Sequence, residues 1–346
     1  MSGPADDPFA ARLTDAGIHR VSLPAGNEMG RVNAWIVDDD PLTLVDAGIG
    51  APGAVEALEA AFRDAGLRLE DLGLLVLTHG HTDHLGMAGD VVRRSGAEVA
   101  ALSPLVPYLG DLPAETAADR AFMAALLRRH GATPEEVAGN DAGWAAFHAL
   151  GGACAVTVPL APGSRVELSG RTLEVLHRPG HSETDVLLVD AARGMAFGGD
   201  HLLRAVPSVP VRDRPLPAGD GARPYAPDTD DAAVEVRYRE SLRATRDVPV
   251  DLVLPGHGGP FDDPAGVVDH HLARQEQDAE GLLRRAGTAP FTAAGLAREI
   301  WPQAPTGLAH VLLSNVLGGL GLLALEGRVG VADPGGDGRP VRFVAG

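Results

Sequence analysis

Residues 72–87 read LGLLVLTHGHTDHLGM, an apolar run followed at once by four potential metal ligands, His79, His81, Asp83 and His84. Neutral imidazole and carboxylate suit Zn²⁺ and related divalent ions. A loop at the end of a strand can aim alternate side chains at one point while an adjacent pair serves a second. In a structural alternative the four side chains only satisfy one another, which is costly because each buried polar group needs its own partner. The spacing therefore predicts a site for two metal ions.

Three further motifs follow predicted strands later in the chain. His181 stands after Pro-Gly in RPGHSETD, Asp200 ends the strand of FGGDHLL behind two glycines, and His257 stands after Pro-Gly in VLPGHGGPF. Taken singly, each is more often a turn or surface residue than a ligand. Their order changes this interpretation, because residues at the ends of successive strands can converge. Together the four motifs indicate one metal centre.

With these motifs the chain resembles the metallo-β-lactamase superfamily over about residues 18–263. The resemblance implies an α+β fold, a four-layer αββα sandwich, with two divalent metal ions. It assigns His79, His81 and His181 to one ion and Asp83, His84 and His257 to the other, with Asp200 as the bridge. Zn²⁺ is the expected ion, and iron and manganese are the alternatives.

The bridging aspartate, and the lack of a cysteine at that position, resemble the glyoxalase II, lactonase and ribonuclease Z side of the superfamily rather than true β-lactamases. The C-terminal segment resembles that of the beta-lactamase-like protein 2 branch, whose chemistry includes RNA cleavage and, in relatives, thioester hydrolysis. The resemblance narrows the subfamily and leaves the substrate open.

Two residues are predicted to support the ligands from behind. Asp46, in TLVDAG, ends a predicted strand and matches a family position behind the ligands, where it would orient a ligand histidine; a plain turn former is the alternative. His201, next to Asp200, is the second, and His177 is a further candidate. The other histidines lack motif context and are expected to be structural or exposed.

The pattern of apolar runs predicts a catalytic domain over residues 1–263 and a C-terminal domain over residues 264–346. In the first, residues 107–152 read as a helical insertion, and residues 207–231, rich in Pro, Asp and Gly, read as a long loop. The chain ends as helix, turn, helix and two strands, the organisation of a winged helix. Its second helix is almost entirely apolar or neutral, so packing or dimerisation is expected there rather than DNA binding.

Composition limits the partners. The 346 residues carry a formal net charge of −18, and all 29 basic residues are arginine. Nucleic acid is held chiefly by cationic side chains, and the sequence shows no basic stripe, so nucleic acid is not an expected partner. The single cysteine, Cys154, excludes an intramolecular disulfide and a multi-thiolate metal site. We expect no membrane-spanning stretch of ~20 apolar residues and a cytoplasmic location.

As a chemical hypothesis, hydroxide held between the two metals attacks the carbonyl carbon of a small-molecule thioester, ester or lactone. Asp83 or Asp200 would orient the hydroxide or carry its proton. Phosphodiester cleavage is the first alternative. A mononuclear iron oxygenase similar to the persulfide dioxygenases, which keeps the site of His79, His81 and His181, is the second. A non-catalytic binding module ranks last, and a homodimer stays open as the oligomeric state.

Overall fold

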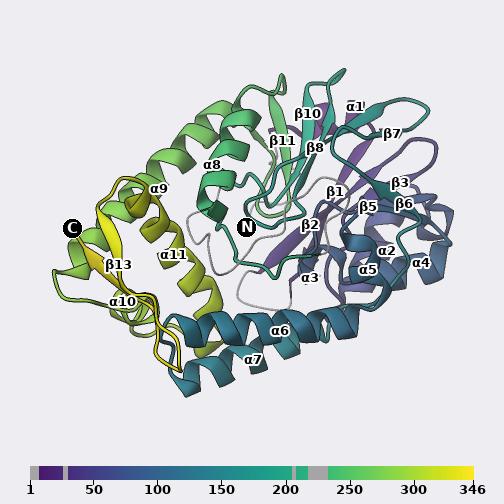
Figure 1. Ribbon diagram of the computed structural model, residues 1–346. Coiled ribbons are helices and arrows are strands. Elements are labelled where there is room, and N and C mark those ends of the chain that lie inside the picture. Colours follow the sequence, from purple (N-terminus) through teal and green to yellow (C-terminus); the bar gives the residue numbers. More distant parts are fainter. Residues whose placement is uncertain (1–7, 26–29, 205–207, 217–232) are drawn as a thin grey trace.

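The computed structural model describes residues 8–25, 30–204, 208–216 and 233–346. Its strands form two six-stranded sheets and a two-stranded hairpin near the C-terminus (Figure 1). The sheets face one another across a shared hydrophobic core, and helices cover their outer faces.

The first sheet comes from the N-terminal half of the chain, and its strands lie in sequence order. They are β1 (Ile18–Pro24), β2 (Arg31–Val37), β3 (Thr43–Val45), β4 (Leu74–Val76), β5 (Glu98–Leu102) and β6 (Val158–Leu160). The pairs from β3 to β6 are parallel, while β1, β2 and β3 pair antiparallel. The carboxyl ends of β3 and β4 therefore meet at one edge, where Asp46 and His79 follow them.

The second sheet has the order β12–β11–β10–β9–β8–β7. Its strands are β7 (Arg165–Glu167), β8 (Thr172–His177), β9 (Val186–Asp190), β10 (Met195–Gly199), β11 (Leu252–Pro255) and β12 (Phe261–Asp262). Only the β10–β11 pair is parallel among these. That pair brings Asp200, after β10, to the same edge as His257, after β11.

Alternating side chains divide the apolar interior into two layers. In β2, Trp35 and Val37 pack into the core between the sheets, whereas Ala34 and Ile36 face the outer helices. Trp35 meets Phe197 of the second sheet with ring centroids 6.4 Å apart. Burying a large apolar side chain contributes roughly 1.5–3 kcal/mol. Because β2 is buried on both faces, its side chains pack into the core between the sheets on one side and against the outer helices on the other.

The outer layers complete the predicted sandwich. Apolar faces of α2 and α4 pack on the first sheet, and those of α8 and α9 pack beside the second. The helices of these layers and the short helices near them are α1 (Ala10–Asp15), α2 (Ala54–Asp64), η2 (Leu69–Asp71), α4 (Ala88–Ser95), α8 (Ala233–Arg246) and α9 (Pro264–Ala286). The order of layers is helix, sheet, sheet, helix, and the predicted αββα fold class is confirmed.

The region predicted as an insertion contains three helices, α5 (Leu105–Gly110), α6 (Leu112–Arg129) and α7 (Pro134–His148). The carboxylate of Asp111 accepts a hydrogen bond from the N–H of Ala114 at the start of α6. Thr133 and Glu136 form a capping box at the start of α7. Figure 1 shows α6 and α7 side by side, reaching from the sheets to the C-terminal helices.

The C-terminal part shares a hydrophobic cluster with this insertion. Its elements after α9 are α10 (Ala293–Ile300), η3 (Thr306–Leu308), α11 (Ala309–Leu325), β13 (Val329–Asp333) and β14 (Arg342–Ala345). Leu127 of α6 and Val137 of α7 belong to the same cluster as Leu317 of α11. The predicted boundary at residue 263 and the winged-helix interpretation stay predictions, and the helices on both sides of that boundary pack as one layer.

The expectation that no apolar stretch approaches ~20 residues needs correction, while the absence of a membrane span stays a prediction. Residues Thr306–Leu325 are long and apolar enough to cross a membrane, with a mean hydropathy of 1.9. Polar residues such as His310 and Ser314 divide this stretch when it is read residue by residue, although its average stays high. The helix is weak evidence for a span, because 56% of it is buried inside the protein and buried core helices have the same composition.

The predicted long loop of residues 207–231 is described in part. Residues 208–216 contain neither helix nor strand, while residue 207 and residues 217–231 lie outside the described residues. Within the described piece Arg212 is 1% exposed. Residues 208–212 are thus largely packed into the interior, whereas residues 213–216 are half-buried.

Candidate metal centre

The four ligand motifs follow strands from both sheets. His79 comes after β4, His181 after β8, Asp200 after β10 and His257 after β11. The β3–β4 and β10–β11 pairs are parallel, and β8 runs in the same direction as β10 because both pair antiparallel with β9. The strand ends therefore gather at one edge of each sheet, and the sandwich places the two edges together. Residues far apart in the sequence meet for this reason.

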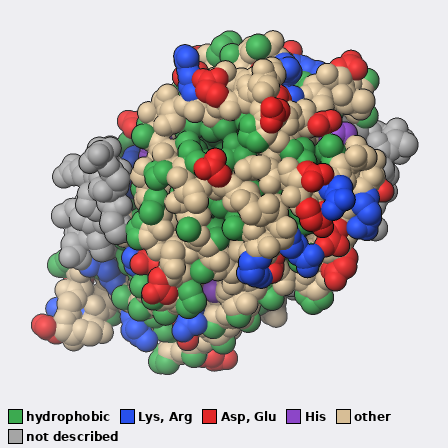
Figure 2. Space-filling model, turned by 90° about the vertical axis from the view of Figure 1, so that its right-hand side faces the viewer, with side chains coloured by type: hydrophobic (Ala, Val, Ile, Leu, Met, Phe, Trp, Pro, Cys, Tyr) green, Lys and Arg blue, Asp and Glu red, His purple; other side chains and the backbone are tan. Residues whose placement is uncertain are grey.

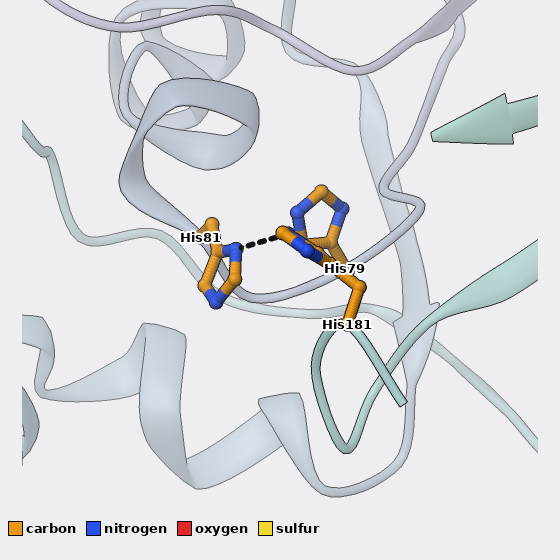
Figure 3. Close-up of side chains that lie close together, drawn as sticks. All are labelled: His79, His81 and His181. Atoms are coloured by element: carbon orange, nitrogen blue, oxygen red, sulfur yellow. Dashed lines mark hydrogen bonds between the residues drawn. The ribbon is translucent and has the colours of Figure 1, made fainter. Parts of the chain in front are cut away.

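Three histidines form a first ligand cluster, His79, His81 and His181 (Figure 3). Their ligating nitrogens lie within 4.8 Å of one another, and His81 Nδ1 is 2.9 Å from His181 Nε2. The chain turns from His79 directly into the single helical turn α3 (Thr82–Leu85), with His81 at its N-cap. These nitrogens are close enough to share one metal ion.

Asp83, His84 and His257 form a second ligand cluster. His257 Nε2 is 3.2 Å from Asp83 Oδ2. Asp200 lies between the clusters: its Oδ1 is 3.3 Å from His84 Nε2, and its Oδ2 is 3.3 Å from His257 Nε2 and 3.7 Å from His181 Nε2. The structure therefore brings all seven predicted ligands together, with Asp200 in contact with both clusters.

Two glycines in the motifs allow this close approach. A Cβ on Gly256 would overlap the carboxylate of Asp200 and lie 2.5 Å from His84 Cε1. Gly199 has a φ of +47°, and a Cβ there would lie 2.6 Å from Thr78 Oγ1. A larger residue at either position would displace a ligand or its support.

Asp46 supports ligands of both clusters from behind. Its Oδ2 is 2.9 Å from His84 Nδ1 and accepts a 2.8 Å hydrogen bond from Thr78 Oγ1, while its Oδ1 accepts one of 2.8 Å from the Thr78 N–H. Thr78 Oγ1 is in turn 3.0 Å from His79 Nδ1. Asp46 has a φ of +59°, a region that Asp and Asn tolerate better than most residues. Such contacts fix the orientation and tautomer of ligand rings.

Backbone carbonyls hold two more ligand rings. His181 Nδ1 is 2.9 Å from the carbonyl oxygen of Val209, and His257 Nδ1 is 2.8 Å from that of Arg31. A carbonyl only accepts hydrogen bonds, so each Nδ1–H donates and each Nε2 is left for the centre. Neither carbonyl was identified in the sequence, because any residue type provides one.

The ring of His81 faces the centre with Nδ1 rather than Nε2, and the residue that orients it lies outside the motifs. His81 Nε2 lies 3.4 Å from Asp213 Oδ2, which leaves Nδ1 for the centre. Asp213 lies in the Pro-rich piece predicted as a loop, where no ligand spacing marks it. The only local signal is an acidic residue between two arginines.

The ring of His201 does not reach the centre. Its Nε2 is 2.8 Å from Thr245 Oγ1 of α8, and within the described ranges no hydrogen bond joins this ring to a predicted ligand. His201 follows Asp200 in the same turn but faces the helix layer. His177 Nε2 bonds the carbonyl of Glu183, and so holds the loop that carries His181.

Buried ligand atoms show that the residues fit a metal. Among the described residues, His79 Nε2 is buried without a hydrogen bond, and His84 Nε2 and Asp200 Oδ1 have only charge contacts of 3.3 Å or longer. An unpaired buried polar atom costs roughly 1–3 kcal/mol. Imidazole and carboxylate ligands without a thiolate suit Zn²⁺ and similar divalent ions. The centre is built to be completed by such ions.

Charges in the centre are strongly coupled. Burial disfavours a charged His257, but hydrogen bonds with Asp200 and Asp83 raise its pKa to about 10. Burial also opposes charge on His84, yet the same two carboxylates raise its pKa well above the usual value. Burial and neighbouring histidines hold the pKa of His79 well below the usual value. A metal ion must displace the protons of the raised groups, because histidine binds metal as neutral imidazole.

A pocket opens beside His81. Its walls come from the ligand loop, from α5 to α7, from the loop after His181 and from residues 213–216. The lining residues are Gly80, His81, Thr82, Leu105, Tyr108, Asp119, Met123, Trp144, His148, Ser182, Glu183, Thr184, Asp213, Arg214 and Leu216. Helices α5 to α7 thus form one wall of a space next to a predicted ligand.

Comparison with known proteins agrees with this architecture. The model of the metallo-beta-lactamase superfamily matches residues 28–257. The probable metallo-hydrolase YqjP of Bacillus subtilis is 26% identical over 315 residues, which are 91% of this chain and 94% of that protein. Ribonuclease J of Mycobacterium tuberculosis is 31% identical over 109 residues, 30% of this chain and 18% of that protein.

Two solved structures share the fold. The metallo-beta-lactamase family protein TTHA1429 from Thermus thermophilus has a TM-score of 0.76 at 23% identity, covering 95% of this chain and 99% of that one. A beta-lactamase domain protein from Burkholderia ambifaria has a TM-score of 0.76 at 24% identity, covering 99% and 98%. Since the family model matches well over half of the chain and the ligand residues meet in one place, the chain belongs to the metallo-beta-lactamase superfamily.

Proposed function

We propose that this protein is a metal-dependent hydrolase that cleaves a carboxylic thioester, ester or lactone with an uncharged, apolar acyl group. The observation that carries the proposal is the pocket beside His81. Leu105, Met123, Trp144 and Leu216 line this pocket together with that ligand. An apolar chain bound there would place its carbonyl group next to the metal centre, and burying it would supply binding energy.

Charge in the pocket supports an uncharged substrate. Arg214 donates to Asp119 at 2.8 Å and also pairs with Glu115, so two carboxylates already neutralise it. Asp213 adds a further carboxylate to the lining, and Glu183 adds one that pairs with Arg237. A phosphodiester would meet these like charges, whereas a neutral acyl group would not. The pocket therefore favours carboxylic substrates over phosphate esters.

Two carboxylates of the chain are placed to handle a proton. Bound divalent ions would lower the pKa of a water molecule and polarise the oxygen under attack. Asp83 Oδ2 and Asp200 Oδ2 lie 3.2 and 3.3 Å from the same atom, His257 Nε2, so they converge on one point. Either carboxylate can orient the nucleophilic water and accept its proton. Asp46 keeps the ring of His84 fixed beside them.

Phosphodiester cleavage is the second candidate. The similarity to ribonuclease J supports it, although only 109 residues match. A net charge of −18 and the carboxylates of the pocket oppose it. On the face shown in Figure 2, arginines stand among acidic side chains rather than in a continuous stripe. Binding of a polyanion depends on clustered cations, which this face does not offer.

A substrate panel with a metal analysis tests the proposal. The panel contains an apolar acyl thioester, the same thioester ending in a carboxylate, a lactone and a bis-phosphodiester, on protein purified without chelator. We expect two zinc ions per chain and a kcat/KM at least about tenfold higher for the apolar thioester or the lactone than for the carboxylated one. Phosphodiester cleavage alone would favour the second candidate, and one iron per chain with oxygen uptake would favour an oxygenase.

A further inference from the structure

We infer that α11, in the C-terminal part of the chain, positions the first ligand cluster through the connecting segment (residues 208–214). This segment passes between the metal centre and α11 without helix or strand. One side of it contacts predicted ligands, and the other side is tied to α11 and α6. The inference requires that the centre binds metal, and it does not depend on the identity of the substrate.

Four inward contacts of the connecting segment end on predicted ligands. These contacts are Ser208 Oγ to Asp200 O at 2.6 Å, Val209 O to His181 Nδ1 at 2.9 Å, Val211 N to His181 O at 3.1 Å, and Asp213 Oδ2 to His81 Nε2 at 3.4 Å. Two of the three ligands in the first cluster, His81 and His181, are thus held by this segment. Both of its ring contacts fix which nitrogen faces the centre.

Arg212 turns to the opposite side and is tied to α11. Its N–H donates to Ser314 Oγ at 3.3 Å, its guanidinium donates to the Ser314 carbonyl at 2.8 Å, and its own carbonyl is 3.0 Å from His310 Nε2. His310 and Ser314 are both 0% exposed and lie one helical turn apart. One residue of the segment is therefore attached to two successive turns of α11.

Arg214 adds a second attachment on the same outward side. It pairs with Asp119 and Glu115 of α6, as described for the pocket. The side chain of Asp213 reaches His81, whereas the side chains of Arg212 and Arg214 on either side of it reach the helices, as expected for extended backbone. The segment thus links the contacts on its two sides, and a shift of α11 would displace the rings of His81 and His181.

The test removes the attachment on α11 and measures zinc binding. His310→Phe keeps a ring of similar size but loses the donor to Arg212, whereas His310→Gln keeps an N–H donor. We expect zinc affinity, measured by competition with a chromophoric chelator, to fall about tenfold in His310→Phe and to recover in His310→Gln. Ser314→Ala is a milder second variant with the same expected direction, in case His310→Phe does not fold.

A control separates positioning from general loss of stability. Leu323→Ala removes a buried side chain near the other end of α11, in the cluster shared with the insertion. It should lower the melting temperature without changing zinc affinity. Equal loss of zinc affinity in Leu323→Ala, or unchanged affinity in folded His310→Phe and Ser314→Ala, would overturn the inference.

A double-mutant cycle tests the path. Asp213→Asn weakens the contact with His81 from inside the segment. If α11 acts through that segment, the two substitutions affect the same path. The fold-loss of zinc affinity in the double variant His310→Phe with Asp213→Asn should then be much smaller than the product of the two single fold-losses. Independent, multiplicative losses would overturn the inference. Missing acyl turnover in the wild-type protein would refute the proposed substrate but leave this result unaffected, because the readout is zinc binding.

Discussion

The two ligand clusters are supported by different parts of the molecule. The second cluster is held from within the sandwich, by Asp46 after β3 and by the carbonyl of Arg31 in β2. The first cluster takes two of its three supports from the connecting segment, and thereby from α11 and α6. One half of the metal centre is held by the first sheet of the sandwich, and the other half depends on helices outside the two sheets.

This difference has a consequence for specificity. The pocket lies on the side of the first cluster, and its walls come from the same insertion and the same piece of chain that hold His81. Substitutions in those elements should therefore affect substrate binding and the first cluster together. Such substitutions should affect the second cluster less, because Asp46 and the carbonyl of Arg31 support it from the first sheet.

The largest expected effect comes from the residue shared by both clusters. Asp200→Ala should lower turnover of the best substrate by at least about 10²–10³-fold and also lower the zinc content. Asp262→Ala, at an exposed ion pair with Arg204, is the control and should change stability by less than about 1 kcal/mol. Normal turnover by Asp200→Ala would refute the assignment of this residue.

Asp46→Asn should weaken both clusters, because Asp46 contacts His84 and reaches His79 through Thr78. Asn tolerates a positive φ, so the backbone can stay as it is. We expect zinc affinity to fall about 10–100-fold in a chelator competition. Asp39→Asn is the matched control, a buried carboxylate paired with an arginine outside the centre. A similar loss of affinity there would show that the fold, and not the ligand support, is responsible.

Zinc binding should strengthen as pH rises. Burial opposes charge on His81, but Asp213 outweighs it and raises the pKa to about 9, and the pKa of His257 is about 10. Both are therefore protonated at pH 7 in the metal-free protein and must lose a proton to bind. His181, whose pKa burial lowers to about 4, is already neutral.

Each displaced proton should weaken zinc affinity about tenfold for every unit that the pH falls below these pKa values. Calorimetry in buffers of different ionisation enthalpy should detect release of more than one proton per chain at pH 7. Affinity that does not change between pH 6 and 8 would contradict the charge states described for both clusters.

The smallest expected effect concerns the pocket alone. Trp144→Ala should lower kcat/KM for a long apolar acyl substrate roughly tenfold, since it removes apolar contact area next to the first cluster. Zinc affinity should fall less than in His310→Phe, because Trp144 packs edge-on against His310 but the contact of His310 with the Arg212 carbonyl stays in place. Trp301→Ala, a partly exposed tryptophan after α10, is the control and should leave both quantities unchanged. An equal effect on short and long acyl chains would show that Trp144 does not contact the acyl group.

The sequence predicted the seven ligands and Asp46, but not the orientation of His201. The metal ligands were predicted because each is a side chain of the right chemistry in a short motif after a strand. Asp46 was predicted because it ends a predicted strand and matches a family position behind the ligands, while His201, next to a motif residue, faces α8 instead. Adjacency in sequence did not predict orientation, since neighbouring residues in a turn can face opposite layers.

The sequence by itself determined the chemistry of the ligands, because the ligand motifs are local properties of the chain, and the resemblance carried by those motifs gave the family and the sandwich. Only the tertiary structure decided what holds the ligands. The carbonyls of Val209 and Arg31 carry no residue signature, and Asp213 gains its role from Arg212, which is anchored by His310 and Ser314 about 100 residues away in sequence. Long-range contacts of this kind depend on which surfaces pack together, and spacing along the chain does not record them.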